Sequence, residues 1–386
     1  MARLIAGVVV WCFVVLHTNA AMDQAIGCTL KRSVYLHPRG HSFFNNAGLR
    51  GGHDDKMQYE DVDEASLPIG YAASQGNLEG VRTALRAGEG DLDWGDVQEG
   101  MVQASARGHI VILQALLDWR AEHGALEPIT DGGSSPLVNA AARGYGDSVR
   151  LLIANGANVS EVDTQFENFH FSGRLSLGST ALIEAAAHGH GEIVGELLSG
   201  GARAEQDMHG RTALSAAAEN GHSHVVDIIL AQLNKSESIQ QMLDLALRTA
   251  VARNDLEIVS KMLDAGAKAD SLPGGGDDCE SVEKHGHREL INLAASSGTA
   301  DILRVLIKHG ANANSQTHAL YGKTPLIIAC ENGNADAVRV LIERGANVSH
   351  TMDRKGPYTA LLAAFEGPIV RMLIEAGADP NQVPKS

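Results

Sequence analysis

Apolar and small residues recur along most of the chain with a period of about 33 residues. Residues 178–204 read GSTALIEAAAHGHGEIVGELLSGGARA, and residues 210–230, which start 32 positions later, read GRTALSAAAENGHSHVVDIIL. Each segment combines a turn, a short Ala-rich run, a Gly break and a longer aliphatic run. A fixed period of this length is typical of solenoid proteins, so the pattern predicts stacked pairs of helices.

Aligning the chain on the residue that separates the two predicted helices gives nine units. This residue is Gly or Asn, the two residue types best suited to a left-handed backbone. The breaks are Gly76, Gly108, Gly144, Gly189, Gly221, Asn254, Gly298, Gly333 and Gly367. Seven positions before each break, or six in the last unit, stands a large apolar residue: Ile69, Met101, Leu137, Leu182, Leu214, Leu247, Ile291, Leu326 and Leu361. Three positions after each of these is an Ala, and we expect it at close helix contacts, where a larger side chain would overpack.

The longer aliphatic runs predict the second helix of each unit. Val149, Leu152 and Ile153 show the i, i+3, i+4 spacing of an amphipathic helix. Many of these runs end in Gly-Ala, as at Gly156-Ala157, and Gly at this position supplies a left-handed helix cap.

The chain therefore resembles an ankyrin-repeat protein. Residues 323–348 (KTPLIIACENGNADAVRVLIERGANV) are similar to the family consensus, and STAL, RTAL and SSPL stand where the family has TPLH. The resemblance covers residues 66–381 and implies an all-α fold, a solenoid of stacked helix-turn-helix units with hairpin loops. The His that usually follows the leading apolar residue is absent from every unit, so we expect different side-chain hydrogen bonds in the hairpins.

Three insertions interrupt the period, near 122–132, 164–177 and 271–287. Insertions in such arrays map to loops on one face, often the binding face. The second insertion contains Phe166, Phe169 and Phe171. These aromatic residues either form an exposed contact patch or fold back over the neighbouring helices.

The N-terminal residues 1–21 have the three features of a secretory signal peptide. Arg3 is the positive charge, residues 4–16 are an apolar core, and Thr18-Asn19-Ala20 ends in a small residue. We expect residues 22–65 to be a disordered leader and linker, first basic and then acidic, ahead of a repeat domain at 66–382. The predicted destination is the secretory pathway or the exterior. The alternatives are a membrane anchor made by an uncleaved N-terminus and a bipartite plastid leader.

Composition narrows the choice of partner. The chain is 44 % hydrophobic but only 4 % aromatic, and its formal net charge is −16. Nucleic-acid binding needs a basic face, so the charge argues against it. It also gives no reason to expect binding to anionic lipid.

No residue set predicts catalysis, a cofactor or a metal. The four cysteines form no CxxC pair; Cys330 is expected to be a buried thiol, and Cys28 and Cys279 are free to pair in an oxidising compartment. His188, His190, His222 and His224 lie at predicted turns, where a structural role is favoured. Asp277, Asp278, Cys279, His285 and His287 match no metal-site spacing. The sequons at Asn158, Asn234 and Asn347 allow glycosylation if the chain is secreted.

The resemblance implies a non-enzymatic scaffold that binds a protein partner on the concave face formed by hairpins and first helices, and we expect a monomer. Ankyrin proteins bind with residues that flank the hairpin and that precede the break. Carried over to this sequence, the candidates are Met208, His209, Arg211, Glu219, Asn220, Ser179, His188, Tyr321, Lys323, Glu331, Asn332, Lys355, Tyr358 and Glu366. The alternatives are a membrane-tethered adaptor and a metal or enzymatic site in the inserted loops.

Overall fold

The structure, a computed structural model, describes nine segments of the chain. They are residues 68–88, 92–123, 135–163, 178–204, 211–233, 237–270, 290–316, 322–354 and 356–381. All of them belong to one compact unit, Asp61–Ser386. The predicted signal peptide, the whole of the predicted leader and linker, and most of the three insertions lie outside the described residues.

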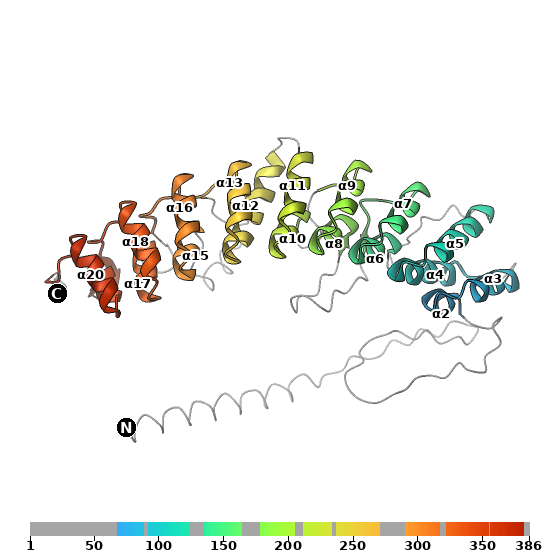
Figure 1. Cartoon of the computed structure of the whole chain (residues 1–386), viewed down its shortest axis with the longest axis horizontal. Coiled ribbons are helices and arrows are strands. Elements are labelled where there is room, and N and C mark those ends of the chain that lie inside the picture. Colours follow the sequence, from blue (N-terminus) through green and yellow to red (C-terminus); the bar gives the residue numbers. More distant parts are fainter. Residues whose placement is uncertain are drawn as a thin grey trace, which may run out of the picture. The chain divides into compact units, whose positions relative to one another are not determined.

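The described helices alternate between two rows (Figure 1). The first-helix row contains α2 (Ile69–Ser74), α4 (Trp94–Arg107), α6 (Pro136–Arg143), α8 (Ala181–Ala187), α10 (Ala213–Glu219), α12 (Glu237–Ala252), α15 (Leu290–Ser297), α17 (Pro325–Glu331) and α19 (Ala360–Ala363). The second-helix row contains α3 (Leu78–Ala87), α5 (Ile110–Glu122), α7 (Gly146–Ala154), α9 (Gly191–Ser199), α11 (Ser223–Gln232), α13 (Leu256–Asp264), α16 (Ala300–Lys308), α18 (Ala335–Glu343) and α20 (Gly367–Glu375).

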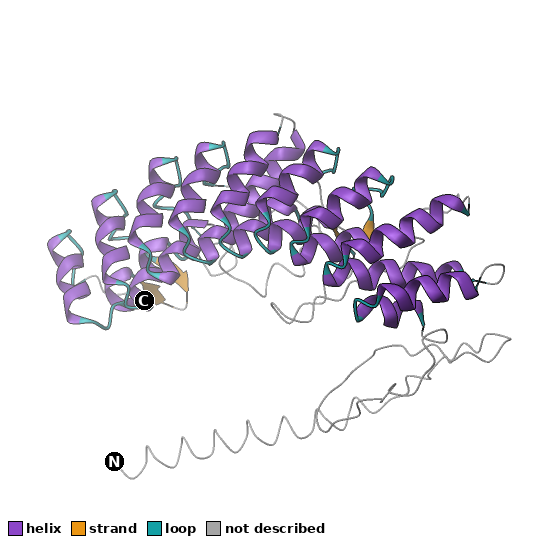
Figure 2. Cartoon of the chain, turned by 45° about the vertical axis from the view of Figure 1, so that its right-hand side comes forward, coloured by secondary structure: helices purple, strands orange, loops and turns teal. Residues whose placement is uncertain are grey.

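Each helix packs against the next helix of its own row and against its partner in the pair (Figure 2). Contacts run from α2 to α4 and on to α19 in the first row, and from α3 to α5 and on to α20 in the second. The pattern of stacked helix pairs confirms the predicted all-α solenoid.

The core lies between the two rows and is built from the predicted periodic positions. Leu214 and Ala217 of α10 are both completely buried. The Ala expected at close contacts is buried in every unit except the last, where Ala364 follows the end of α19 and is partly exposed. Ala at these sites lets neighbouring helices approach closely.

Hydroxyl side chains begin the first helices. The N-cap side chains of Ser135, Thr180, Thr212, Thr324 and Thr359 each accept a hydrogen bond from the backbone amide three residues later. This bond satisfies an amide that has no partner within the helix. The SSPL, STAL and RTAL tetrapeptides therefore act as helix caps without the family's usual His.

The predicted left-handed breaks are confirmed in all units but the last. Every Gly break before Gly367 has a positive φ, and Asn254 has a φ of 58°. The prediction for Gly367 is wrong: this residue is the first of α20, and it follows an extended turn in which Ala364 and Glu366 have ψ angles of 122° and 131°. One residue fewer separates it from the leading Leu361, so the usual turn is not formed.

Two short antiparallel hairpins link consecutive pairs. β1 (Val162–Asp163) pairs with β2 (Ser179–Thr180), with Val162 opposite Thr180. β3 (Met352–Arg354) pairs with β4 (Gly356–Tyr358), with Met352 opposite Tyr358. The second strand of each hairpin ends at or directly before the N-cap Thr of the following first helix.

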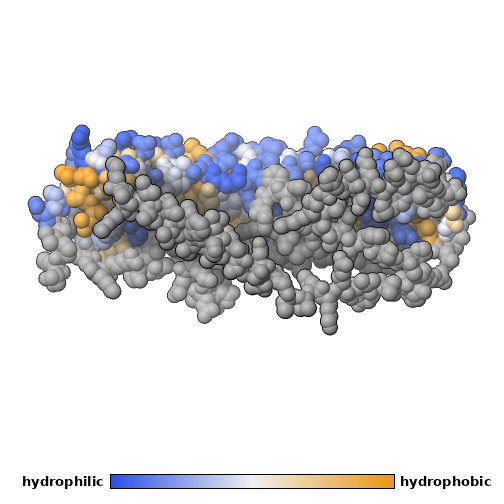
Figure 3. Space-filling view, turned by 90° about the horizontal axis from the view of Figure 1, so that it is seen from below, coloured by the Kyte–Doolittle hydropathy of each residue, from blue (hydrophilic) through white to orange (hydrophobic). Residues whose placement is uncertain are grey.

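The C-terminal end of the described chain exposes apolar side chains (Figure 3). Leu362 is 58 % exposed, although Val138, Ile183 and Ile327 at the equivalent positions are each 1 % exposed. In the other pairs the following unit covers this position, and no described helix pair follows α20.

Candidate interaction surface

One position recurs at the edge of the first-helix row. It is the residue immediately before the left-handed turn, and in the second to eighth units we call these residues the pre-turn row: Arg107, Arg143, His188, Asn220, Arg253, Ser297 and Asn332. Arg107, Arg143, Arg253, Ser297 and Asn332 are exposed, and His188 and Asn220 are partly buried. Because consecutive first helices are in contact, the pre-turn residues of successive pairs follow one another along one edge.

Three predicted binding residues of this row bond to their own helix. The Asn220 Nδ2 donates to the Ala216 carbonyl at 3.0 Å, and Asn332 makes the equivalent bond to Ile328 at 2.8 Å. The Nδ1 of His188 lies 2.9 Å from the Glu184 carbonyl oxygen. Each of these carbonyls also accepts a hydrogen bond from the backbone amide of the same residue, so the side chain adds a second bond at the helix end.

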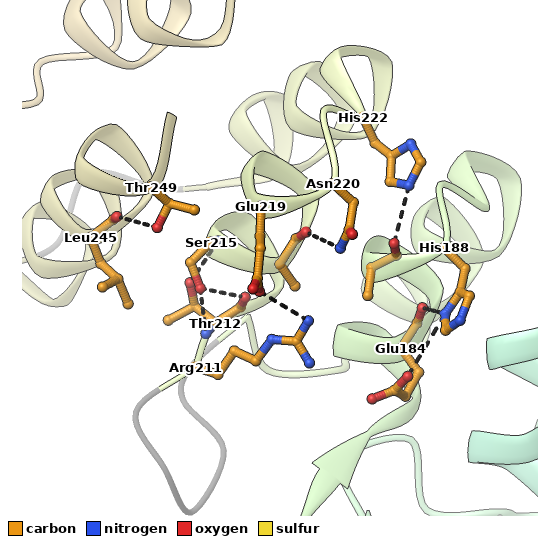
Figure 4. Close-up of polar contacts among 12 residues, drawn as sticks. Glu184, His188, Arg211, Thr212, Ser215, Glu219, Asn220, His222, Leu245 and Thr249 are labelled. Carbon is orange, nitrogen blue, oxygen red and sulfur yellow. Dashed lines mark hydrogen bonds and ion pairs between the residues drawn. The ribbon is translucent and has the colours of Figure 1, made fainter. Parts of the chain in front are cut away.

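Four other predicted residues form two equivalent ion pairs. Arg211 contacts Glu219 at 3.4 Å in one unit (Figure 4), and Lys323 contacts Glu331 at 2.6 Å in another. Each cation directly precedes the capping Thr of a first helix, and each acid ends that helix. The pairs therefore tie the residue before the N-cap to the pre-turn edge.

The carboxylate of Glu331 also affects the next unit. Burial raises the pKa of the Tyr358 phenol above its usual value, and the negative charge of Glu331 raises it further. Glu366 is the N-cap residue of α20, although its side chain makes no capping hydrogen bond. Its carboxylate lies against Gly333, in the turn of the preceding pair.

One predicted site residue does not belong to an accessible surface. Ser179 is completely buried, because it lies in β2 opposite Asp163 and directly before the capping Thr180. We therefore exclude Ser179 from the candidate surface. Met208, His209, Tyr321 and Lys355 lie outside the described residues.

Three arginines of the pre-turn row were not among the predicted binding residues. Arg107, Arg143 and Arg253 occupy the register of His188 and Asn220, so comparing every unit at this position identifies them. Within the part of the chain that the structure describes, none of them forms an ion pair or a side-chain hydrogen bond. Their charges are presented to solvent.

The histidines at the turns have a structural role, as predicted. The Nε2 atoms of His190, His222 and His224 lie 3.0–3.3 Å from backbone carbonyl oxygens of the preceding unit. Figure 4 shows the contact of His222. Burial lowers the pKa of His190, which favours the neutral ring in this position.

A buried carboxylate joins the third and fourth units. Oδ2 of Asp163, a fully buried residue, accepts a hydrogen bond of 2.6 Å from the backbone amide of Ser135. Nearby, burial and the charge of Asp163 together raise the pKa of Glu161 to about 7, and burial is the larger cause. Protonation of Glu161 is therefore coupled to the packing of this junction.

The described residues offer little reactive chemistry. Cys330 is fully buried as predicted, and burial raises the pKa of its thiol to about 12, so it is a poor nucleophile. Among the described residues, no three His, Cys, Asp or Glu side chains are placed to hold a metal ion, and none of the described helices is long and apolar enough to span a membrane. Cys28, Cys279, the Phe-containing insertion and Asp277, Asp278, His285 and His287 lie outside the described residues.

Stacked helix pairs joined by capped hairpins define a solenoid repeat protein. The family profile described as Ankyrin repeats (3 copies) matches residues 166–241, 182–272, 247–352 and 291–383, and the profile described as Ankyrin repeat matches residues 132–164. The chain belongs to the ankyrin-repeat family. Ankyrin-repeat domains generally mediate protein–protein interaction.

The chain is also similar to individual ankyrin-repeat proteins. The chain is 32 % identical over 170 residues to "Ankyrin repeat protein nuc-2" of Neurospora crassa, a match that covers 40 % of this chain and 14 % of that protein. The crystal structure of the ankyrin repeat domain of Bcl-3, a member of the IkappaB family, is similar with a TM-score of 0.51 and 23 % identity, and the match covers 63 % of this chain and all of that one. The human ASB11 ankyrin repeat domain matches 64 % of this chain and 98 % of its own, with 23 % identity and a TM-score of 0.48.

Proposed function

We propose that this protein is a non-enzymatic scaffold that binds a protein partner along the pre-turn row and the adjoining hairpin bases. One observation carries the proposal. The large apolar and Ala positions of the repeat are buried in every unit before the last and vary little, whereas the pre-turn position is exposed or partly exposed and carries Arg, His, Asn or Ser. Variation at an accessible, regularly spaced position supplies specificity without disturbing the core.

The charges of the second helices support this choice of face. Arg304 pairs with Asp301 at 2.7 Å, and Arg339 pairs with Asp336 at 2.9 Å, each within one turn of an outer helix. Such exposed i, i+3 pairs are typical of a solvated surface and contribute little to stability. The cations of the pre-turn row have no such partner, so they are available to a binding protein.

The non-enzymatic part of the proposal rests on the family and on the chemistry of the described residues. Ankyrin-repeat relatives are typically interaction modules. The one described cysteine is held protonated in the core.

We also propose that the protein enters the secretory route and acts as a monomer. The support is the charge, length and small-residue end of residues 1–21. Sequencing the N-terminus of the mature protein tests the first point: cleavage after the small residues near position 20 supports it, and an intact Met1 contradicts it. Light scattering of the purified chain tests the second.

Site-specific photocrosslinking tests the binding face. A photoreactive amino acid replaces Ser297 of the pre-turn row in one variant and Glu343 of α18 in another, because both residues are exposed. The full chain is then irradiated with proteins of its own compartment. The proposal expects a defined crosslinked protein from position 297 and none from position 343. Crosslinks from position 343 alone would contradict it.

A further inference from the structure

We propose that the part of the pre-turn row between α4 and α13 binds an extended, acidic peptide segment, with Arg107, Arg143 and Arg253 as its anion contacts. This inference rests on the proposed function and adds the chemistry of the partner to it.

The three arginines are exposed cations on a strongly acidic protein. The formal net charge of the chain is −16, so an acidic ligand is repelled by most of its surface. Arg107, Arg143 and Arg253 occupy the same register at the ends of three first helices, and none is neutralised by a described side chain. A local excess of positive charge therefore coincides with the repeated edge.

Three acids that neighbour the turns of this row in sequence are already engaged. Glu219 pairs with Arg211, and Asp147 in the first turn of α7 pairs with Arg150. The Oδ1 of Asp255 caps α13 by accepting a hydrogen bond of 3.1 Å from the Ile258 amide. These carboxylates have partners of their own, so the arginines remain the available charges.

The side chains between the arginines suit an extended main chain. His188 and Asn220 occupy the two intervening pre-turn positions; both are polar and partly buried, and both are held to their own helices. Figure 4 shows these two residues on neighbouring first helices, on the same side as Glu219. A peptide crossing this region meets polar groups and no projecting apolar side chain at these positions.

The register predicts a spacing for the acidic residues of the ligand. Packed helices lie about 10 Å apart, and an extended chain rises about 3.3 Å per residue, so one helix pair corresponds to about three ligand residues. Arg107 and Arg143 belong to adjacent pairs, and Arg253 lies three pairs beyond Arg143. The matching ligand has acidic residues near positions i, i+3 and i+12.

A purely structural role for these arginines makes a different prediction. Arg107 and Arg143 lie in the last turns of α4 and α6, where a cation also stabilises the helix dipole. That interaction is local to each helix, so a purely structural role predicts that substituting the arginines lowers stability alone. Ligand binding predicts an effect on affinity that depends on all three residues.

The test measures fluorescence polarisation of a labelled 16-residue peptide with Glu at positions 1, 4 and 13 in a Gly/Ser/Thr background, titrated with the full chain at low salt. A peptide with Lys at the same positions is the charge-reversed probe. We expect the Glu peptide to bind, the Lys peptide not to bind, and added salt to weaken binding by screening.

Two triple variants with the same change in net charge locate the site. Arg107→Gln, Arg143→Gln and Arg253→Gln remove the row, whereas Lys308→Gln, Arg344→Gln and Arg371→Gln remove three exposed cations of the second-helix side. The first variant should bind the Glu peptide at least about tenfold more weakly, and the second should bind it within about twofold of the unmodified chain. Circular dichroism melting verifies that both variants fold.

Three results would overturn the inference: no binding of the Glu peptide, equal loss in both variants, or stronger binding of the Lys peptide. None of these results bears on photocrosslinking from Ser297. If crosslinking succeeds and the peptide does not bind, the scaffold function stands and only the acidic partner is wrong. If crosslinking occurs from the second helices alone, the proposed face itself is wrong.

Discussion

Nζ of Lys323 lies 2.6 Å from Oε2 of Glu331, eight residues further along the chain. Arg211 and Glu219 have the same separation in sequence and meet in the same way, at 3.4 Å. Both pairs connect the residue before a capping Thr to the end of the helix that this Thr begins. Four residues expected to contact a partner thus first stabilise the edge on which the pre-turn row lies.

Removing one acid of these pairs should change the titration of a neighbouring tyrosine. In Glu331→Gln, the pKa of Tyr358 falls toward the ordinary value of a phenol but stays above it, because burial is the larger cause of the rise. Absorbance titration of the phenols measures the change, and Glu219→Gln is the control because it removes the equivalent acid. Identical titration curves for the unmodified chain and Glu331→Gln would contradict the assignment.

Substituting Gly144 and Gly156 by Ala should distinguish the cost of a left-handed backbone from the cost of a steric clash. Gly144 and Gly156 have φ angles of 81° and 84°, but an added Cβ would lie 2.6 Å from the His190 ring at Gly144 and within 4 Å of nothing at Gly156. Gly156→Ala should cost about 1 kcal/mol, from the left-handed backbone alone. Gly144→Ala should cost about 1–3 kcal/mol more, because the ring must move.

Urea unfolding midpoints compare these two variants, and the double variant Gly144→Ala, His190→Ala measures the contribution of the ring. The double variant also loses the contact of His190 with the Ala142 carbonyl oxygen, so we expect partial recovery only. Equal costs at the two glycines would show that the histidine does not fix the turn.

Stability should fall as pH rises through the range in which Glu161 ionises. The folded-state pKa is raised from 4.5 to about 7, so between these values the folded chain binds more protons than the unfolded chain. Unfolding therefore becomes easier as pH rises from about 4.5 to about 7, and Glu161→Gln should remove this part of the dependence.

Melting temperatures at pH 5 and pH 8 measure the effect. Relative to the unmodified chain, Glu161→Gln should gain about 1 kcal/mol or less at the higher pH, since solvent screens a half-buried carboxylate. Glu343→Gln, on the exposed side of α18, is the control. A difference between Glu161→Gln and the unmodified chain that does not change with pH would rule out the coupling.

Cys330 should be unreactive in the folded protein. The side chain is completely buried and its pKa is about 12, so very little thiolate forms at neutral pH. Alkylation with iodoacetamide, followed by mass spectrometry of the peptide that contains Cys330, should show no label in buffer and full label in urea. Labelling in buffer at the rate of an unfolded peptide would contradict the burial.

The repeat positions were predictable because every unit must bury the same apolar and Ala positions against its neighbours. Leu214 and Ala217 are buried as the period predicts, and Asn254 adopts the left-handed backbone that its place in the series requires. Gly367 was misassigned because alignment on the glycine ignored a missing residue in the turn. A period identifies equivalent positions only while the spacing between them is conserved.

The candidate surface was less predictable because side-chain partners depend on geometry. Nothing in the local sequence shows that Arg211 reaches Glu219, or that Ser179 faces the core. The pre-turn arginines were detectable in principle, since Arg107 and Arg143 share the register of His188. Recognising them requires comparing the units position by position. A consensus does not reveal them, because the pre-turn position carries Arg, His, Asn or Ser in different units.

The binding face itself is tested most directly by amide hydrogen exchange of the full chain, free and bound to the protein captured by crosslinking. The account predicts slower exchange in the bound state at the turns that follow the pre-turn row, around Gly108, Gly144, Gly221 and Gly298. It also predicts unchanged exchange at the ends of the second helices, around Gly156, Gly266 and Gly345. Protection confined to the second-helix ends would contradict the proposed scaffold surface.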